Sequence, residues 1–414
     1  MYYLTLTIFI VSSLLSGSLG KEGFGPGEQD WGHVTVRQYS HMFWWLYYTT
    51  ANVQSYYERP LLIWLQGGPG GSSTSYGNFE EIGPLNTNLK ARNYTWVKDY
   101  NVLFIDNPVG TGFSYVENVA AYAKTNKQIA LDLVECMKGF LKELPEFSDV
   151  PTYILTESYG GKMGAEFALV WYKAEKAGNI KSNLKGVGLG DAWISPIDSV
   201  MTWAPFLFNA GMIDSNGYDN IDKSAKATRD AVNNGKWLTA TSLWGDTENV
   251  ILKATDNIDF YNILTKLSPS FIRSQNHGEK SSIHIDKDAI YQGLSYRDSG
   301  SLEQLMNGPV RKALGIKNYH NEQSNNVFYM LRQDFMKPVV DKGTILWVDT
   351  LKWKNSNYWI NSERRSLVFD NIIEGYSKRY NNFGVYWVNR AGHMVPKDNP
   401  AAMGMILKDL LDNA

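Results

Sequence analysis

PTYILTESYGGKMGAEFALVWYKA, residues 151–174, is the stretch of sequence that decides the fold. Its first half is a short apolar run typical of a buried strand, and its second half carries apolar residues at helical spacing. Ser158 stands at the junction, where a sharp strand-to-helix turn needs small neighbours so that the two elements can pack. The turn departs from the G-x-S-x-G pattern because Thr156 replaces the first glycine. Taken alone, the pattern also fits a serine that caps a helix.

Other apolar runs follow the same plan. Residues 59–66 (RPLLIWLQ) end in the glycine-rich GGPGGSS, residues 100–115 (YNVLFIDNPVGTGFSY) end in a turn with proline and glycine, and residues 184–196 (LKGVGLGDAWISP) predict a fourth strand. Residues 33–49 alternate and predict edge strands or a hairpin. Short buried strands that alternate with helices predict an α/β protein with a mostly parallel central sheet and helices on both faces. Functional residues gather at the carboxyl ends of the strands in such sheets.

The pattern changes between about residues 199 and 298, which are polar, helix-prone and short of buried strands. Because no low-complexity linker bounds this segment, we interpret it as a helical insertion that caps the sheet within a single domain of residues 21–414. Strands resume with TILWVD, residues 344–349, and with FGVYWVNRAGHMVP, residues 383–396.

Residues 1–20 predict a signal peptide, because an apolar run from Tyr2 to Leu15 precedes the small residues SGSLG. No later stretch is apolar for long enough to cross a bilayer. The sequon NYT predicts glycosylation at Asn93, which also fits the secretory route. We therefore expect a secreted or lysosomal protein.

Charge and metal-binding residue types exclude several classes of function. The formal net charge of -2 argues against a nucleic-acid or polybasic membrane surface, since either requires clustered cations. The single cysteine, Cys136, lies among apolar residues at helical spacing and predicts a buried structural thiol. The six histidines are scattered and form no His-x-x-x-His pair. We expect no metal and no cofactor.

A candidate base follows the last predicted strand. His393 lies in the Gly-rich loop AGHMVP, where a histidine is often structural, but its position late in the chain fits the order Ser, acid, His of α/β-hydrolases. The GGPGG turn at residues 67–71 adds backbone N–H groups that can approach a substrate closely, because glycine has no side chain.

Six motifs, in this order, resemble those of the serine carboxypeptidases: PLLIWLQGGPGGSS, EEIGPL, NVLFIDNPVGTGFSY, TESYGGKMG, MNGPVRKALGI and AGHMVP. WGHVTVRQYSHMFWWLYY and LGDAWISPIDSV resemble the retinoid-inducible branch of that family. The resemblance covers essentially the whole mature chain. It implies an α/β-hydrolase fold and a serine-type carboxypeptidase that releases C-terminal residues from peptides through an acyl-enzyme.

The resemblance also implies the roles of individual residues. Ser158 would be the nucleophile and His393 the base. The other implied residues bind parts of the substrate: the backbone N–H groups of Gly68 and Tyr159 form the oxyanion hole, and Gln66 and Glu157, with Glu81 behind them, grip the terminal carboxylate. Gly71, often cysteine elsewhere in the family, and Gln66, often asparagine, look like features of this branch.

The triad acid is the part of the family pattern that this sequence lacks. In the family the acid follows a strand and a turn, between DFMKP and a W-V-x-x-L-K-W element. Here QDFMKPVVDK runs directly into GTILWVDTLKW, so a segment is missing between Lys342 and Gly343. Asp341 matches the helix before the missing strand, and Asp349 matches a position after the acid. Asp349 could serve only if TILWV replaced the lost strand, which would require a rebuilt sheet register.

Two hypotheses of different classes follow. The first is a carboxypeptidase whose activity is impaired, and the second is an inactive homologue that still binds peptide C-termini through Gln66 and Glu157. A third, an acyltransferase that uses the same serine, has no residue in its favour.

Overall fold

The computed structural model describes residues 20–267, 299–317, 320–321, 324–339 and 353–413. The predicted signal peptide apart from its last residue, the end of the predicted insertion and the predicted strand TILWVD lie outside these ranges. So do Asp341, Asp349 and the junction of Lys342 with Gly343, and the expectations for them stay predictions.

A seven-stranded sheet forms the centre of the molecule, with six strands in the order β1-β2-β4-β3-β6-β7 and β5 paired to β2. These strands are β1 (Gln29–Arg37), β2 (Ser40–Tyr47), β3 (Leu61–Leu65), β4 (Asn101–Ile105), β5 (Tyr115–Val116), β6 (Thr152–Glu157) and β7 (Leu184–Gly190). The sheet is mixed: β4, β3, β6 and β7 run parallel, whereas β1 and β2 form the predicted antiparallel hairpin at one edge. The predicted α/β architecture is confirmed.

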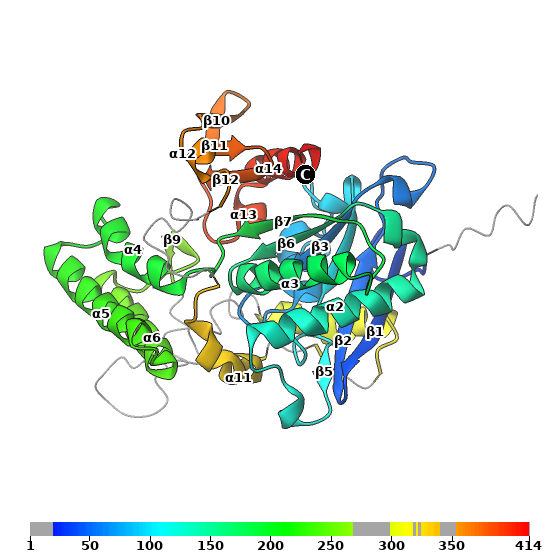
Figure 1. Cartoon of the computed structure of the whole chain (residues 1–414), viewed down its shortest axis with the longest axis horizontal. Helices are drawn as coiled ribbons and strands as arrows, with labels where there is room; N and C mark the ends of the chain where they lie inside the picture. The colour runs from blue at the N-terminus through cyan, green and yellow to red at the C-terminus, as the bar shows by residue number, and fades with distance from the viewer. Residues whose placement is uncertain (1–19, 268–298, 318–319, 322–323, 340–352, 414) are drawn as a thin grey trace, which may run out of the picture.

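Helices cover both faces of the sheet, which is why every residue of β3, β4 and β6 is buried. On one face lie α2 (Asn126–Glu143) and α3 (Tyr159–Lys176) (Figure 1). The other face packs against the π-helix η2 (Ser73–Ile82) and α14 (Pro400–Asp412). Cys136 of α2 has no exposed surface, so the predicted burial of this thiol is confirmed, and burial raises its pKa to about 12.

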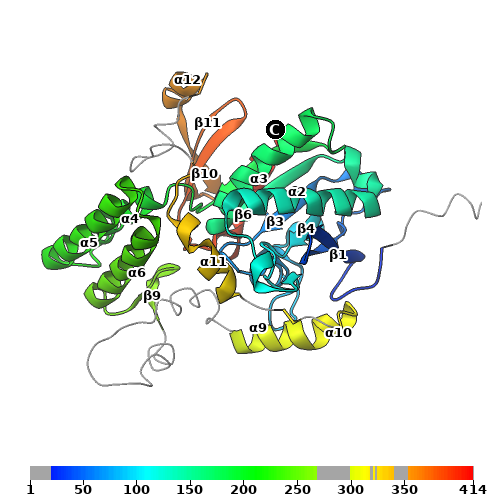
Figure 2. The same ribbon diagram turned by 60° about the horizontal axis from the view of Figure 1, so that its bottom comes forward.

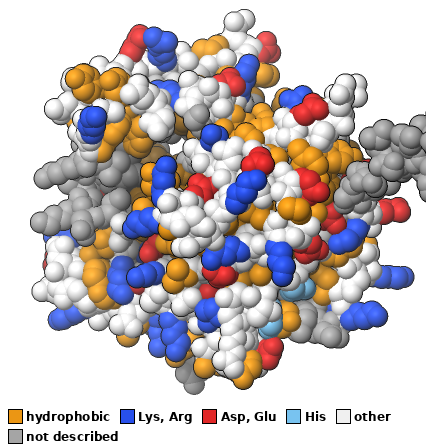
Figure 3. Space-filling model, turned by 45° about the vertical axis from the view of Figure 1, so that its right-hand side comes forward, with side chains coloured by type: hydrophobic (Ala, Val, Ile, Leu, Met, Phe, Trp, Pro, Cys, Tyr) orange, Lys and Arg blue, Asp and Glu red, His pale blue; other side chains and the backbone are white. Residues whose placement is uncertain are grey.

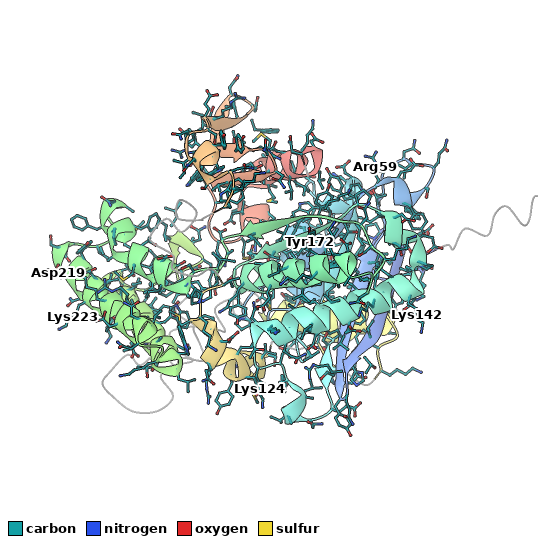
Figure 4. The ribbon with its side chains drawn as sticks, in the orientation of Figure 1. Arg59, Lys124, Lys142, Tyr172, Asp219 and Lys223 are labelled. Carbon is teal, nitrogen blue, oxygen red and sulfur yellow. The ribbon has the colours of Figure 1, made fainter. Side chains whose placement is uncertain are left out.

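The segment after β7 forms a helical cluster of α4 (Pro196–Asn209), α5 (Ser215–Asn233) and α6 (Trp237–Ala254). Both ribbon views place this cluster to one side of the central sheet (Figures 1 and 2). The middle helix is amphipathic: Ile221 is buried, whereas Asp219 and Lys223 are exposed and project from the outer side of α5 (Figure 4). A short hairpin of β8 (Ile258–Asp259) and β9 (Asn262–Lys266) follows the helices.

The remaining elements are α9 (Ser299–Leu305), η6 (Met306–Val310), α10 (Arg311–Ala313), α11 (Asn325–Phe335), α12 (Ser356–Ile360), β10 (Arg364–Phe369), β11 (Ile372–Tyr380), β12 (Phe383–Val388) and α13 (Val395–Asp398). The late strand predicted in residues 383–396 is therefore present, but β10, β11 and β12 form an antiparallel sheet of their own. Within the described ranges β7 ends the central sheet, and none of its residues is fully buried. No described strand of one sheet pairs with a described strand of the other.

Candidate active site

Ser158 stands between the last residue of β6 and the first residue of α3. Its backbone has φ 59° and ψ −128°, a conformation that non-glycine residues rarely adopt and that costs about 1–3 kcal/mol. The side chain makes no capping hydrogen bond to α3, so the helix-cap interpretation does not describe it. The turn has the strained geometry of a nucleophile elbow.

Small residues allow the elbow to pack, as the sequence predicted. A Cβ atom on Gly160 would lie 2.4 Å from the carbonyl oxygen of Leu65, so no larger residue fits. The backbone then fixes the turn: the Ser158 N–H donates to the Gly190 carbonyl, and the Trp193 N–H donates to the Ser158 carbonyl, both at 2.9 Å. The position of Ser158 is therefore set by β3, β6 and the turn after β7 together.

The glycine-rich turn after β3 lies directly against the elbow. A Cβ atom on Gly67 would lie 2.7 Å from Ser158 Cβ and 3.0 Å from the backbone nitrogen of Tyr159. Gly68 follows with φ 111°, a conformation that favours glycine, and the Gly71 N–H closes the turn on the Gly67 carbonyl at 3.0 Å. The structure thus brings the predicted oxyanion-hole residues close to Ser158, at the N-terminus of α3 where free N–H groups favour negative charge.

Gln66 and Glu157 meet at the carboxyl ends of two neighbouring parallel strands, since Leu65 of β3 pairs with Thr156 of β6. Trp64 Nε1 donates to Gln66 Oε1 at 2.8 Å, which directs the amide nitrogen of Gln66 toward Glu157. Gln66 Nε2 then donates to Glu157 Oε1 at 3.0 Å. The two side chains form one rigid polar unit beside the elbow.

Glu81 of η2 completes this unit. It is buried, and its carboxyl group interacts with the side chains of Glu157 and Gln66. Its carboxyl group faces that of Glu157, and two carboxyl groups can hydrogen bond only if one carries a proton. Burial raises the pKa of Glu81 to about 7, and burial followed by the charge of Glu81 raises the pKa of Glu157 well above its ordinary range. The buried pair of carboxyl groups therefore binds a proton more tightly than an isolated glutamate would.

His393 lies in the loop between β12 and α13. The residue as a whole is partly exposed, but its Nε2 atom is buried and has no hydrogen-bond partner among the described residues. The hydrogen bond expected of a working Ser158–His393 pair is therefore not formed in this state, and their close approach stays a prediction. Burial lowers the pKa of His393 to about 4, and no described carboxylate opposes that shift.

The histidine loop nevertheless borders the carboxyl unit. Lys397 of α13, four residues after His393, forms an ion pair with Glu80 of η2. Glu80 is the neighbour of Glu81, and the Lys397 charge acts on the Glu81 carboxyl group. The base candidate and the carboxylate-binding candidates therefore flank the same helix.

Two residues near the site were not anticipated from the sequence. Asp191 follows the carboxyl end of β7, and its charge helps to raise the pKa of Glu157. A signal existed for Asp191, because it follows a predicted strand as Gln66 and Ser158 do. Tyr261 lies in the β8–β9 turn and contacts His393, and it carried no recognisable signal because the hairpin itself was not predicted.

A charged binding surface, a metal site and a membrane span would each require particular features of the described residues. On the face shown in Figure 3, basic and acidic side chains are interspersed. Among the described residues there is no group of three or more His, Cys, Asp or Glu that could hold a metal ion. No helix in the described ranges combines the length and the apolar character that a membrane span needs.

Comparison with known proteins identifies relatives over nearly the whole chain. The family model for serine carboxypeptidases matches in two pieces, residues 21–345 and residues 342–413. The retinoid-inducible serine carboxypeptidase of Mus musculus is 42% identical over 431 residues, which cover 95% of this chain and 94% of the relative. The Homo sapiens protein of the same name is 42% identical, with 90% and 89% covered. The crystal structure of a prohormone-processing carboxypeptidase from Saccharomyces cerevisiae superposes with a TM-score of 0.76 at 21% identity, covering 93% of this chain and 91% of that one.

Proposed function

Because the chain belongs to the serine carboxypeptidase family, we propose that it releases C-terminal residues from peptides through an acyl-enzyme on Ser158. The observation that carries this assignment is the strained elbow at Ser158, set directly beside the buried unit of Gln66 and Glu157. A nucleophile and a group suited to bind a carboxylate lie on adjacent strand ends. A peptide held by its terminal carboxylate would present its last peptide bond to Ser158.

The residues have complementary parts in such a reaction. Ser158 Oγ attacks the carbonyl carbon while its proton passes to the His393 imidazole, which later delivers it to the departing amino group. The backbone N–H groups of Gly68 and Tyr159 stabilise the oxygen that becomes negative. Water then attacks the acyl-enzyme by the same route in reverse. Because burial holds the pKa of His393 near 4, the imidazole is neutral, and able to accept a proton, in mildly acidic solution.

Turnover by this chain is proposed to be low, because several observations support a missing triad acid. The family match breaks within residues 342–345. The alignment with the mouse relative spans 431 residues, more than the 414 of this chain, so it includes positions that the chain lacks. His393 also has no carboxylate partner among the described residues. The same observations favour the second candidate function, an inactive homologue that retains peptide C-termini.

Covalent labelling separates the two functions. We expect a fluorophosphonate probe to label the unmodified chain to one probe per protein, slowly, because the elbow and the oxyanion hole remain while the base lacks its acid. Ser158→Ala should show no labelling, and mass spectrometry of the labelled peptide should place the adduct on Ser158. If a C-terminal peptide binds the chain but no adduct forms at any time, the binding function is correct and the hydrolase assignment fails.

Binding of a peptide C-terminus is expected to weaken as pH rises through about 7. The bound carboxylate lies beside Glu157 and Glu81, and tight binding requires that this group of acids keep its proton. Loss of one proton should weaken binding by about tenfold for each pH unit above the apparent pKa. Calorimetry with a non-hydrolysed peptide between pH 4.5 and 8 measures this slope.

Glu157→Gln provides the matched change, since glutamine keeps the hydrogen-bonding shape but cannot ionise. The slope should become flat in Glu157→Gln and stay unchanged in Glu303→Gln, which alters an exposed residue on α9. The stability of the folded protein should also decrease as pH rises. A carboxyl group whose folded pKa is raised stabilises the fold below its ordinary pKa of 4.5, and this contribution is lost as pH rises to about 7. A slope that persists in Glu157→Gln would show that another group senses pH.

We propose the secretory route as the location, secreted or lysosomal. The apolar run and small residues of positions 1–20 support it. Asn93 of the sequon is exposed on a surface bend between η2 and the short helix η3 (Trp96–Lys98). Because its side chain is not buried, a glycan can be attached there. We propose Asn93 as the glycosylation site.

A further inference from the structure

The β8–β9 turn contacts the candidate base through both the backbone and the ring of Tyr261. The His393 N–H donates to the Tyr261 carbonyl at 2.8 Å, and the two rings meet edge to face with centroids 5.2 Å apart and planes at 67°. The contact is close enough to dictate the preceding residue: a Cβ atom on Gly392 would lie 2.2 Å from the Tyr261 carbonyl oxygen. Both the backbone carbonyl and the ring of Tyr261 therefore contact His393.

Tyr261 is itself held firmly. Its N–H donates to Asp259 Oδ1 at 2.9 Å, and Thr265 Oγ1 donates to Asp259 Oδ2 at 3.2 Å, so the buried Asp259 carboxylate ties the turn across the hairpin. Ile258, the first residue of β8, is buried in the apolar cluster formed by α4, α5 and α6. The position of the turn is thus set by the helical insertion.

The other described contacts of the histidine loop lie beyond the imidazole. The Gly392 N–H donates to Asp398 Oδ2 at 2.8 Å, and Asn399 Nδ2 donates to Glu374 Oε2 at 2.8 Å. These bonds shape the loop and attach it to the three-stranded sheet, but neither touches the ring. Among the described residues, the aromatic contact made by the His393 ring is with Tyr261.

We infer that Tyr261 is a positioning residue, through which the helical insertion holds the His393 imidazole in place while no described carboxylate does so. The inference rests on the proposed role of His393 as the base. It gives the insertion a function in orienting the base, separate from covering the sheet. The acids that face the Tyr261 phenol are Glu248 of α6 and Glu157, and the phenol stays neutral because burial and these charges raise its pKa.

The test follows the imidazole directly by NMR in the full chain labelled with ¹⁵N-histidine, with His393→Gln used to assign the signal. The unmodified protein should titrate His393 near pH 4, as expected for a buried ring. Tyr261→Ala removes the ring contact, so the midpoint should move up toward the ordinary value of about 6.5 and the tautomer signals should broaden. Tyr261→Phe keeps the ring and the carbonyl, and should restore the low midpoint.

Two glycine variants test the same inference by changing the backbone next to His393 or, as a control, elsewhere. Gly392→Ala should also raise the midpoint, because its Cβ atom forces the loop away from the Tyr261 carbonyl. Gly404→Ala is the matched control, since a Cβ atom on that exposed residue of α14 would meet nothing within 4 Å, and its midpoint should stay low. Gly392→Ala decides the question if Tyr261→Ala fails to fold.

A low midpoint retained in both Tyr261→Ala and Gly392→Ala would overturn the inference. The labelling rate of Ser158 is the second readout, and it should fall in these two variants and not in Tyr261→Phe. The titration does not depend on activity. If titration behaves as expected but no chain, including the unmodified one, is labelled, then Tyr261 positions the imidazole and the proposed function is what fails.

Discussion

Insertion of a strand, a turn and an aspartate between Lys342 and Gly343 is expected to raise kcat for peptide hydrolysis by about 10⁴-fold. A triad acid makes no bond to the substrate. It holds the imidazole in the tautomer that accepts the serine proton and stabilises the imidazolium that forms, and its loss leaves only the contribution of the oxyanion hole and of binding. The pKa of His393 should also rise from about 4, since a nearby carboxylate favours the charged ring. Steady-state kinetics on a peptide substrate measure the gain.

Two variants separate the acid from the restored strand. The same insertion with asparagine in place of the aspartate should rebuild the strand but leave kcat within about tenfold of the unmodified chain, because the charge is absent. Asp349→Asn in the unmodified chain should change nothing. Full activity of the unmodified chain, together with its loss in Asp349→Asn, would identify Asp349 as the acid and would show that the interpretation of the gap is wrong.

Gly67→Ala is expected to slow labelling of Ser158 by about 10²–10³-fold, the size of effect seen when one oxyanion-hole donor is removed. The added Cβ atom would lie 2.7 Å from Ser158 Cβ, 2.8 Å from the Glu157 carbonyl oxygen and 3.0 Å from the Tyr159 nitrogen. These neighbours are backbone or elbow atoms that cannot move independently. The glycine-rich turn must therefore shift away, which takes the Gly68 N–H out of line with the oxyanion.

The control for this change is again Gly404→Ala, which should label at the normal rate. Peptide binding should be only modestly affected in Gly67→Ala, because the hydrogen bond from Gln66 to Glu157 does not pass through Gly67. Labelling rates and peptide affinity measured on the same preparation, with circular dichroism to confirm folding, provide the comparison. A normal labelling rate in folded Gly67→Ala would place the oxyanion hole elsewhere.

Local sequence signals predicted the elbow because the chemistry and the packing there have the same requirements. Ser158 must follow a buried strand and start a helix, and Gly160 must be small because a Cβ atom there would lie 2.4 Å from the Leu65 carbonyl oxygen of β3. Both requirements appear within a few residues of sequence. The position of Gln66 at a strand end is predictable for the same reason, since parallel strands bring their carboxyl ends together.

Other features depend on contacts between distant segments, and no local pattern encodes them. The raised pKa values of Glu81 and Glu157 arise because η2 and β6 meet after folding, although the two residues are 76 positions apart in the chain. The contact of Tyr261 with His393 joins the β8–β9 turn to a loop near the end of the chain. That β10, β11 and β12 form a sheet of their own was likewise not predicted, because the residue pattern of a strand does not indicate which sheet the strand joins.

The separate sheets have a consequence for how often the reacting groups meet. Ser158 follows β6 in one sheet and His393 follows β12 in the other, and among the described residues no continuous ladder of backbone hydrogen bonds joins the two. Well-oriented groups within one molecule react with effective molarities that correspond to about 7–11 kcal/mol of the barrier. That advantage requires the His393 imidazole to lie within hydrogen-bonding distance of Ser158 Oγ for much of the time. Among the described residues, the local concentration of imidazole around the serine therefore depends on contacts such as that of His393 with Tyr261, and changes in those contacts would change the reactivity of Ser158.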